Sequence, residues 1–199
     1  VLSNIAMAAP KPTTKPAAAT PSATPKVVNI SCSPTTAHGD NAAEYKARRS
    51  AIQKPKVQKF SKNKVFTLTT NCGDIVIEAN SKSAPITTSM LTGLITGKFY
   101  NKTICHRMIY SENAALLQCG DPTATGSGGP QFTYPDENLP ANKKNNYPAG
   151  TVAMANSGPN TNGSQFFLVY ANTTLAPSYT IWGTITSGLD IVKDIAKAG

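Results

Sequence analysis

Arg107 and Gln118 are the two residues whose types and spacing most suggest a functional site. They lie in the stretch ICHRMIYSENAALLQCGD, residues 104–121, where a polar segment separates two apolar runs. If these runs are neighbouring strands of a hairpin, Gln118 returns beside Arg107. The pair would then present a planar fork of N–H donors next to an amide that both donates and accepts. Neither of the two apolar runs contains an acidic partner for the arginine. The alternative is that Arg107 pairs with a distant carboxylate and takes no part in a site.

The other reactive side chains form no recognisable nucleophilic or metal site. Ser164 lies in NGSQ, not in the G-x-S-x-G turn of a nucleophilic serine. Cys105 and His106 are adjacent, so in a strand they point to opposite faces, with Cys105 on the face of Arg107. Residues 126–129, GSGG, lack the Lys-Ser/Thr ending of a phosphate-binding loop. Because no two cysteines form a CxxC pair and the two histidines, His38 and His106, lie far apart in the sequence, we expect neither a metal nor a cofactor.

The excess positive charge belongs to the first third of the 199-residue chain. Residues 1–64 contain 11 Lys and Arg against 2 Asp and Glu, whereas residues 65–199 contain 8 of each. A basic segment is compatible with an anionic partner such as a nucleic acid. We expect a solvated linker instead, and no nucleic-acid partner, because the globular part is neutral.

The first third is predicted to be an extension in two parts. Residues 1–39 form a stalk, because the Ala/Pro/Thr-rich stretch 8–26 buries little apolar surface and favours polyproline II. Residues 40–64 form a basic helix and linker, with Asp40 as the N-cap and Pro55 ending the helical pattern. No stretch approaches 18 consecutive apolar residues. We expect a bacterial extracytoplasmic protein, anchored to the cell membrane by a segment absent from this chain.

Residues 65–199 have the pattern of a mainly β domain. Segments 65–71 and 74–80 alternate by twos across Asn-Cys-Gly-Asp, a hairpin signal. Residues 84–97 open with a proline and carry an apolar stripe at helical spacing, and residues 188–198 predict a second helix. Further short strands between Gly, Pro and Asn loops favour an antiparallel barrel closed at its ends. These strands are ICHRMI, ALLQCG, TVAMAN, QFFLVY and TIWGTIT.

The four cysteines leave two possibilities open. In an oxidising compartment Cys105 could bond to Cys119, and Cys32 with Cys72 would then tie the extension to the domain. The alternative is four free buried thiols that pack as small hydrophobic side chains.

Several motifs, in their order and spacing, resemble the cyclophilin family of peptidyl-prolyl isomerases. The resemblance covers about residues 65–199, and CHR followed by LLQCGDPT resembles the bacterial extracytoplasmic branch. It implies an eight-stranded antiparallel barrel capped by two helices, here with an N-terminal extension. It also implies a role in protein folding, by accelerating rotation of X-Pro bonds in peptides and unfolded proteins. The motifs are ICHRMI, LLQCGDPTATGSGGP, FTYPDEN, AGTVAMANSGPNTNGSQFF and TIWGTIT.

The resemblance also implies roles for individual residues. Arg107 falls on the catalytic arginine, and Gln118 on a glutamine that binds the substrate backbone. Ala155 and Asn156 fall on a segment that pairs with the substrate backbone, and Phe167 falls on the phenylalanine of the proline pocket. The remaining pocket positions are Leu116, Leu175 and Tyr179.

The sequence departs from the family pattern at four places. About three extra residues between Arg107 and Gln118 produce YSEN, which we expect to loop outward at the hairpin tip. A pocket aromatic is replaced by Ala115 or its neighbour, so we expect reduced activity, not its loss. Thr174 replaces a tryptophan that binds cyclosporin, so weak cyclosporin binding at most is expected. The chain ends where members add a closing strand, so either the last strand is missing or an open seam remains, which the N-terminal tail could fill.

Two other functions remain as alternatives. One is a proline-peptide binding or chaperone module that keeps the groove with weak or no turnover. The other is regulatory: the chain's own Pro-rich stalk would dock in the groove of a neighbouring molecule.

Overall fold

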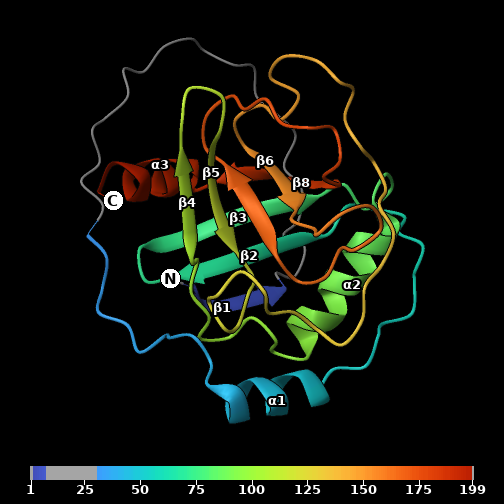
Figure 1. The fold of residues 1–199 in the computed structure, drawn as a ribbon, viewed down its shortest axis with the longest axis vertical. Helices are drawn as coiled ribbons and strands as arrows, with labels where there is room; N and C mark the ends of the chain where they lie inside the picture. The colour runs from blue at the N-terminus through green and yellow to red at the C-terminus, as the bar shows by residue number, and fades with distance from the viewer. Residues whose placement is uncertain (1, 8–30, 199) are drawn as a thin grey trace.

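The computed structural model describes residues 2–7 and 31–198, and its described elements are eight strands and three helices (Figure 1). The antiparallel, mainly β architecture agrees with the sequence-based prediction. The strands are β1 (Leu2–Met7), β2 (Val65–Thr70), β3 (Gly73–Ala79), β4 (Arg107–Tyr110), β5 (Ala115–Cys119), β6 (Thr151–Met154), β7 (Phe166–Val169) and β8 (Ile181–Ser187), and the helices are α1 (Ala42–Ser50), α2 (Pro85–Thr96) and α3 (Leu189–Ala198).

All strands belong to one curled sheet in the order β1-β2-β3-β8-β6-β7-β5-β4. Every neighbouring pair is antiparallel. Among the described residues no backbone pairing joins β1 to β4, so the sheet is a half-barrel and not a fully closed barrel. Figure 1 shows α2 and α3 at opposite ends of the sheet, in agreement with the two predicted capping helices.

The two faces of the central strands bury different sets of side chains. In β7, Phe166 and Leu168 belong to the main core, whereas Phe167 and Val169 belong to a second, smaller apolar cluster. This division follows from the two-residue period of a strand. The main core stabilises the fold, and the second cluster lies on the face that carries the candidate site.

The hairpin signals are confirmed with small shifts of their boundaries. The β2–β3 turn has Gly73 at a φ of 121°, a left-handed conformation that favours glycine. At the β4–β5 hairpin, YSEN forms the tip, where the Ser111 N–H donates to the Ala114 carbonyl at 2.8 Å. Tyr110, beside this tip, is 84% exposed. The insertion therefore loops outward, as expected, and leaves the strand pairing intact.

Of the two possibilities for the four cysteines, the structure shows the disulfide-bonded one. Cys32–Cys72 ties the extension to the β2–β3 turn, and Cys105–Cys119 connects the start of the β4–β5 hairpin to its end. The prediction that Cys105 shares a face with Arg107 is wrong. Strand β4 begins at Arg107, so the alternation does not reach Cys105, which packs against the main core.

The extension lies against the domain at several points. Residues 2–7 of the predicted stalk form β1 and pair with β2, while residues 8–30 of that segment lie outside the described part. Helix α1 is capped by Asn41 and not, as predicted, by Asp40. Asp40 instead accepts hydrogen bonds from Arg48 at 2.6 and 2.8 Å, because the ion pair draws its carboxylate away from the helix end.

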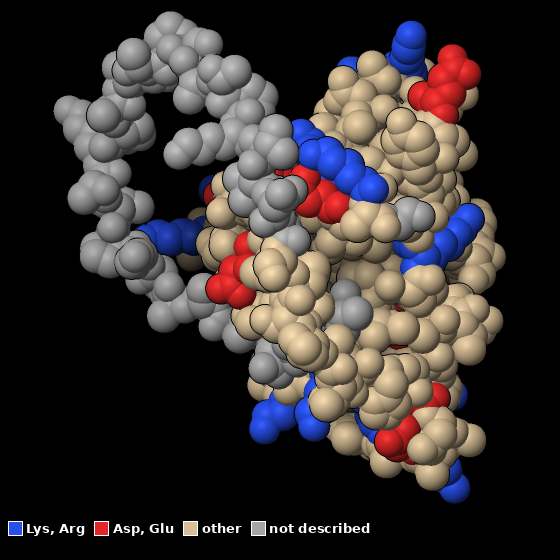
Figure 2. All heavy atoms as spheres, turned by 90° about the vertical axis from the view of Figure 1, so that its left-hand side faces the viewer, with Lys and Arg blue, Asp and Glu red and all other residues tan. Residues whose placement is uncertain are grey.

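Charged side chains are interspersed on the face shown in Figure 2. Lys and Arg side chains of its described residues alternate with Asp and Glu and do not gather into one patch. None of the helices in the described ranges has the length and apolar character needed to cross a membrane.

Candidate active site

Four neighbouring strands place a row of paired residues across one face of the sheet. Arg107 of β4 lies opposite Gln118 of β5, Gln118 lies opposite Phe167 of β7, and Phe167 lies opposite Ala153 of β6. Directly paired residues in an antiparallel sheet project to the same face. The predicted return of Gln118 beside Arg107 is therefore what the structure shows.

Hydrogen bonds fix the polar end of this row. Arg107 Nη1 donates to Gln118 Oε1 at 3.3 Å, and Gln118 Nε2 donates to Gln165 Oε1 at 2.8 Å. Gln165 Nε2 in turn donates to the carbonyls of Gly126 and Gly128, both at 2.9 Å. Gln165 was not predicted as a site residue, although its position next to β7 in NGSQFF was a usable signal.

Arg107 is the positive charge of this row. Its side chain is exposed, and it takes part in none of the ion pairs found among the described residues. The alternative of pairing with a distant carboxylate is thus not observed in this part of the chain. Burial lowers the pKa of the neighbouring His106, outweighing the opposite influence of Asp121. His106 is therefore neutral at pH 7 and leaves the charge to Arg107.

The second apolar cluster, called the slot below, lies along the row beside Arg107. Leu116 and Phe167 are 4% and 3% exposed, and the Phe167 ring packs edge to face against Tyr179 with centroids 5.6 Å apart. Tyr147 packs against both rings, at 6.0 and 6.2 Å. The slot is completed by Ala153 and Val169, with Ile109, Ala155, Leu175, Tyr179 and Ile181 partly buried against it.

Hydrogen bonds to Asn146 and Tyr147 hold the loop that carries Leu175 and Tyr179. The Tyr147 hydroxyl accepts a hydrogen bond from the Tyr179 N–H at 3.1 Å, and burial raises the pKa of Tyr147 to about 12. Asn146 forms two bonds with the backbone of Leu175, at 2.7 and 3.0 Å. Tyr147 was missed at the sequence level because it lies in an irregular loop, NNYPAG, without a periodic pattern.

Ala155 and Asn156 continue β6 beyond its last paired residue. The Ala155 N–H donates to the Gln165 carbonyl at 2.9 Å. The Asn156 side chain donates to the Ser178 carbonyl at 2.8 Å and accepts from the Gly158 N–H at 3.3 Å. Because the side chain of Asn156 is used within the fold, a ligand would meet mainly the backbone here. Of the eight predicted site residues, five belong to the second apolar cluster, Arg107 and Gln118 adjoin it through strand pairing, and Asn156 follows Ala155 in the chain.

The expectation that Ala115 or its neighbour replaces an aromatic of the pocket does not hold for Ala115 itself, which does not face the slot. It is 6% exposed and belongs to the main core. Leu116 and Ile109 line the slot at this end of the hairpin.

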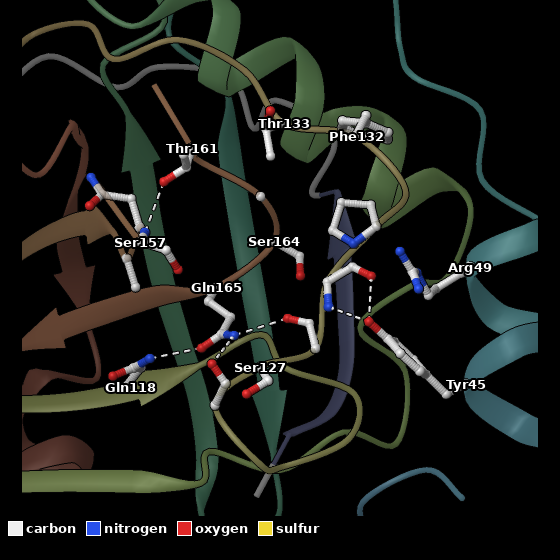
Figure 3. A pocket seen from close by; sticks show the side chains of 17 residues that line it. Tyr45, Arg49, Gln118, Ser127, Phe132, Thr133, Ser157, Thr161, Ser164 and Gln165 are labelled. Carbon is white, nitrogen blue, oxygen red and sulfur yellow. Dashed lines mark hydrogen bonds between the residues drawn. The ribbon is translucent and has the colours of Figure 1, made fainter. Parts of the chain in front are cut away.

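A polar pocket of about 400 Å³ adjoins the row on the side of Gln118 (Figure 3). Ala155 lines this pocket and also packs against the apolar cluster, and Gln118 lines the pocket and pairs with Phe167 of the cluster. The pocket is lined by Tyr45, Arg49, Gln118, Phe132, Thr133, Ala155–Ser157, Thr161, Gly163–Gln165 and the loop 126–130.

A buried carboxylate holds one wall of this pocket. Asp121 accepts hydrogen bonds from the N–H and hydroxyl of Thr123, both at 2.8 Å, and from the Gly126 N–H at 2.6 Å. Burial by itself would raise the pKa of Asp121, but these hydrogen bonds outweigh it and lower that pKa. A Cβ on Gly128 would clash with the carboxylate, so the loop closes tightly around Asp121.

Acid should remove the stability that the Asp121 carboxylate gives to this wall. A carboxyl whose pKa is lowered in the folded state adds stability above its unfolded pKa of about 4, and this is lost as the pH falls through the lowered value. We expect Asp121→Asn to reduce the free energy of unfolding at pH 7 by about 1–3 kcal/mol. Below pH 4 the free energy of unfolding of this variant should fall less steeply with pH than that of the wild type. Urea unfolding between pH 7 and pH 3 measures both. The exposed Asp74→Asn variant is the control, and an equal loss in both variants would contradict the assignment.

Comparison with known proteins agrees with this fold. The family model described as "Cyclophilin type peptidyl-prolyl cis-trans isomerase/CLD" matches residues 65–199. Since the match covers more than half of the sequence, the chain belongs to the cyclophilin family. Helix α1 lies outside the matched residues.

Individual relatives support the same assignment. "Probable peptidyl-prolyl cis-trans isomerase B" of Mycobacterium leprae is 45% identical over 143 residues, covering 67% of this chain and 48% of the relative. "Peptidyl-prolyl cis-trans isomerase-like 3" of Dictyostelium discoideum is 40% identical and covers 66% of this chain and 81% of the relative. The chain thus spans about half the length of the mycobacterial relatives it matches.

Solved structures show the same fold. A cyclophilin type peptidyl-prolyl cis-trans isomerase of Cryptosporidium parvum aligns with a TM-score of 0.53 at 32% identity, over 61% of this chain and 76% of that one. A second structure, determined in the presence of the dipeptide Ala-Pro, aligns with a TM-score of 0.53 at 31% identity, over 61% and 77% of the two chains.

Proposed function

We propose that this chain is a peptidyl-prolyl cis-trans isomerase that accelerates rotation of X-Pro bonds in peptides and unfolded proteins. One observation carries the proposal: the Arg107 guanidinium lies beside Gln118 in a row that continues to Phe167 of the second apolar cluster, outside the ion pairs of the described residues. Family membership supports it.

The reaction needs no covalent chemistry. Rotation about an X-Pro bond breaks amide conjugation, with a barrier of about 18–20 kcal/mol, and takes tens of seconds without a catalyst. As the bond twists, the prolyl nitrogen regains a lone pair that can accept a hydrogen bond. An arginine donor aimed at that nitrogen binds the twisted state better than the planar one, which is the condition for catalysis.

The residues divide this work between them. Arg107 uses one donor on Gln118, and its other N–H groups have no protein partner in the described part of the chain. A charged hydrogen bond contributes about 1.5–3 kcal/mol. Phe167 and Leu116 offer the proline ring an apolar floor, and Gln118 with the Ala155–Asn156 backbone would hold the preceding residues.

Turnover on a short peptide tests the proposal directly. An Ala-Pro peptide should show cis–trans exchange by NMR that becomes faster in proportion to the concentration of the protein. Binding without faster exchange would refute the isomerase and would establish the alternative, a proline-peptide binding or chaperone module.

We further propose that the protein acts outside the cytoplasm of a bacterium, anchored at the cell membrane. The two disulfides support an oxidising compartment, and the mycobacterial relatives support a bacterial origin. Fractionation of the source cells should recover the protein with the membranes, its disulfides intact. Recovery as a reduced cytosolic protein would contradict this.

Two finer proposals concern ligands. Thr174 contributes no aromatic surface, so cyclosporin should bind weakly at most, and tight binding in calorimetry would contradict this. The Ala-Pro and Thr-Pro dipeptides of the extension resemble substrates, so we propose that the stalk can occupy the groove of another molecule. Deleting residues 8–26 should then raise the activity at high protein concentration, and unchanged activity and association would exclude the idea.

A further inference from the structure

Helix α1 is held rigidly against the domain at the polar pocket. Arg48 donates to Asp40 and also to the carbonyls of Phe99 and Asn101, at 2.9 and 3.1 Å. The Tyr45 hydroxyl donates to the Gly129 carbonyl at 2.9 Å and accepts from the Gly129 N–H at 2.8 Å. The helix therefore forms a fixed wall of the pocket, although it lies outside the matched family domain.

Arg49 brings an uncompensated positive charge to this wall. Its guanidinium carbon lies 5.0 Å from the centre of the Tyr45 ring, and its Nε is buried without a hydrogen-bond partner among the described residues. It takes part in none of the ion pairs found there. Residues 8–30, which the structure does not describe, contain no Asp or Glu.

The pocket itself supplies no negative charge to balance Arg49. None of its lining residues is an Asp or a Glu. Figure 3 shows Arg49 and Tyr45 on one side, with Gln118 and Gln165 across from them. The hydrogen bonds between these two glutamines and the loop carbonyls already engage their facing groups. A polar ligand group in the pocket therefore meets Arg49 as its strongest unused donor.

The pocket is continuous with the proposed substrate site. Ala155 lines the pocket and packs against the apolar cluster, and Gln118 lines the pocket and pairs with Phe167 of that cluster, so a peptide with its proline at Phe167 has the pocket beside it. A chain advances by about 3.3 Å per residue, and a cavity of about 400 Å³ accommodates a side chain. The pocket is therefore within reach of a side chain of the same peptide.

We propose that Arg49 is a specificity residue that selects a carboxylate side chain, Glu or Asp, near the proline of the substrate. This rests on the proposed isomerase function and names its substrate class: acidic proline-containing segments. The N-terminal helix thereby adds a selectivity that the family domain does not contain in itself. The Tyr45 ring lies against the Arg49 guanidinium, and the hydrogen bond from Tyr45 to Gly129 holds the helix at the pocket wall.

Pairs of peptides that differ only in the charge of one side chain test this preference. Each pair of peptides carries Glu in one member and its neutral counterpart Gln in the other, at one position at a time. The positions tested are the three before and the two after a single X-Pro bond. NMR with the full chain measures kcat/KM and Kd for each peptide. At one position Glu should be favoured over Gln by about tenfold at low salt, equivalent to about 1.4 kcal/mol, and less at high salt. Ratios near one at every position would overturn the proposal.

Variants assign the preference to Arg49. Arg49→Gln should reduce the Glu/Gln ratio to about one, Arg49→Lys should retain part of it, and Arg49→Glu should favour Lys peptides. Lys46→Gln removes an equal charge from the exposed side of the same helix and should leave the ratio unchanged. An unchanged ratio in Arg49→Gln would contradict the assignment. If no peptide is turned over, the isomerase proposal fails. The proposal for Arg49 is still tested separately, by the ratio of the Kd values of the Glu and Gln peptides.

Discussion

Replacing Arg107 by Ala should lower kcat/KM in a proline-limited refolding assay by about 100-fold, equivalent to about 2.7 kcal/mol. The reason is the loss of a charged donor that acts on the twisted bond and only weakly on the planar one. Because Arg107 is exposed and bonded only to Gln118 in the described residues, the variant should unfold at nearly the wild-type temperature.

A second substitution at this position separates charge from shape. Arg107→Lys keeps the positive charge but loses the planar fork that bonds to Gln118. It should recover part, and not all, of the activity lost in Arg107→Ala. If Lys and Ala are equally inactive, the fork matters more than the charge. If Arg107→Ala keeps wild-type activity, Arg107 is not catalytic.

Replacing Phe167 by Leu should raise KM for proline peptides by about tenfold, since the slot loses its aromatic floor and about 1.4 kcal/mol of contact with the proline ring. Phe167 belongs to the apolar cluster of the site, whereas the preceding Phe166 contacts Tyr100 and Trp182 in the main core. Peptide kinetics and urea unfolding on both Leu variants measure the two effects.

Phe166→Leu is the matched control because the two rings point to opposite faces of β7. It should reduce the free energy of unfolding by about 1–2 kcal/mol and leave KM unchanged. Equal changes of KM in both variants would show that Phe167 acts through stability and not as the floor of the slot.

Strand periodicity explains why much of the site was predictable. Alternation in LLQCG and FFLV places Gln118 and Phe167 on one face, and antiparallel pairing then brings Arg107 into the same row. The resemblance to the family added roles that periodicity does not supply. Leu175 and Tyr179 lie in a loop, and only the resemblance implied that they belong to the apolar site for the proline ring.

What the sequence did not reveal depends on contacts between distant segments. Asp40 and Asn41 are both suitable caps for α1, and the ion pair with Arg48 decides between them. Tyr45 and Arg49 reach the pocket only because α1 docks on the loop around Gly129, which is 84 residues beyond Tyr45. Neither periodicity nor the family pattern carries that information.

The most direct measurement of the central claim compares peptide binding and bound-state exchange in one experiment. NMR line-shape analysis of an Ala-Pro peptide, with wild-type protein and with Arg107→Ala, gives both the Kd and the rate of cis–trans exchange on the protein. Our account predicts that Kd changes by less than about threefold, or about 0.7 kcal/mol, while the exchange rate falls by about 100-fold. A variant that binds more weakly but exchanges the bound peptide as fast as the wild type would contradict it.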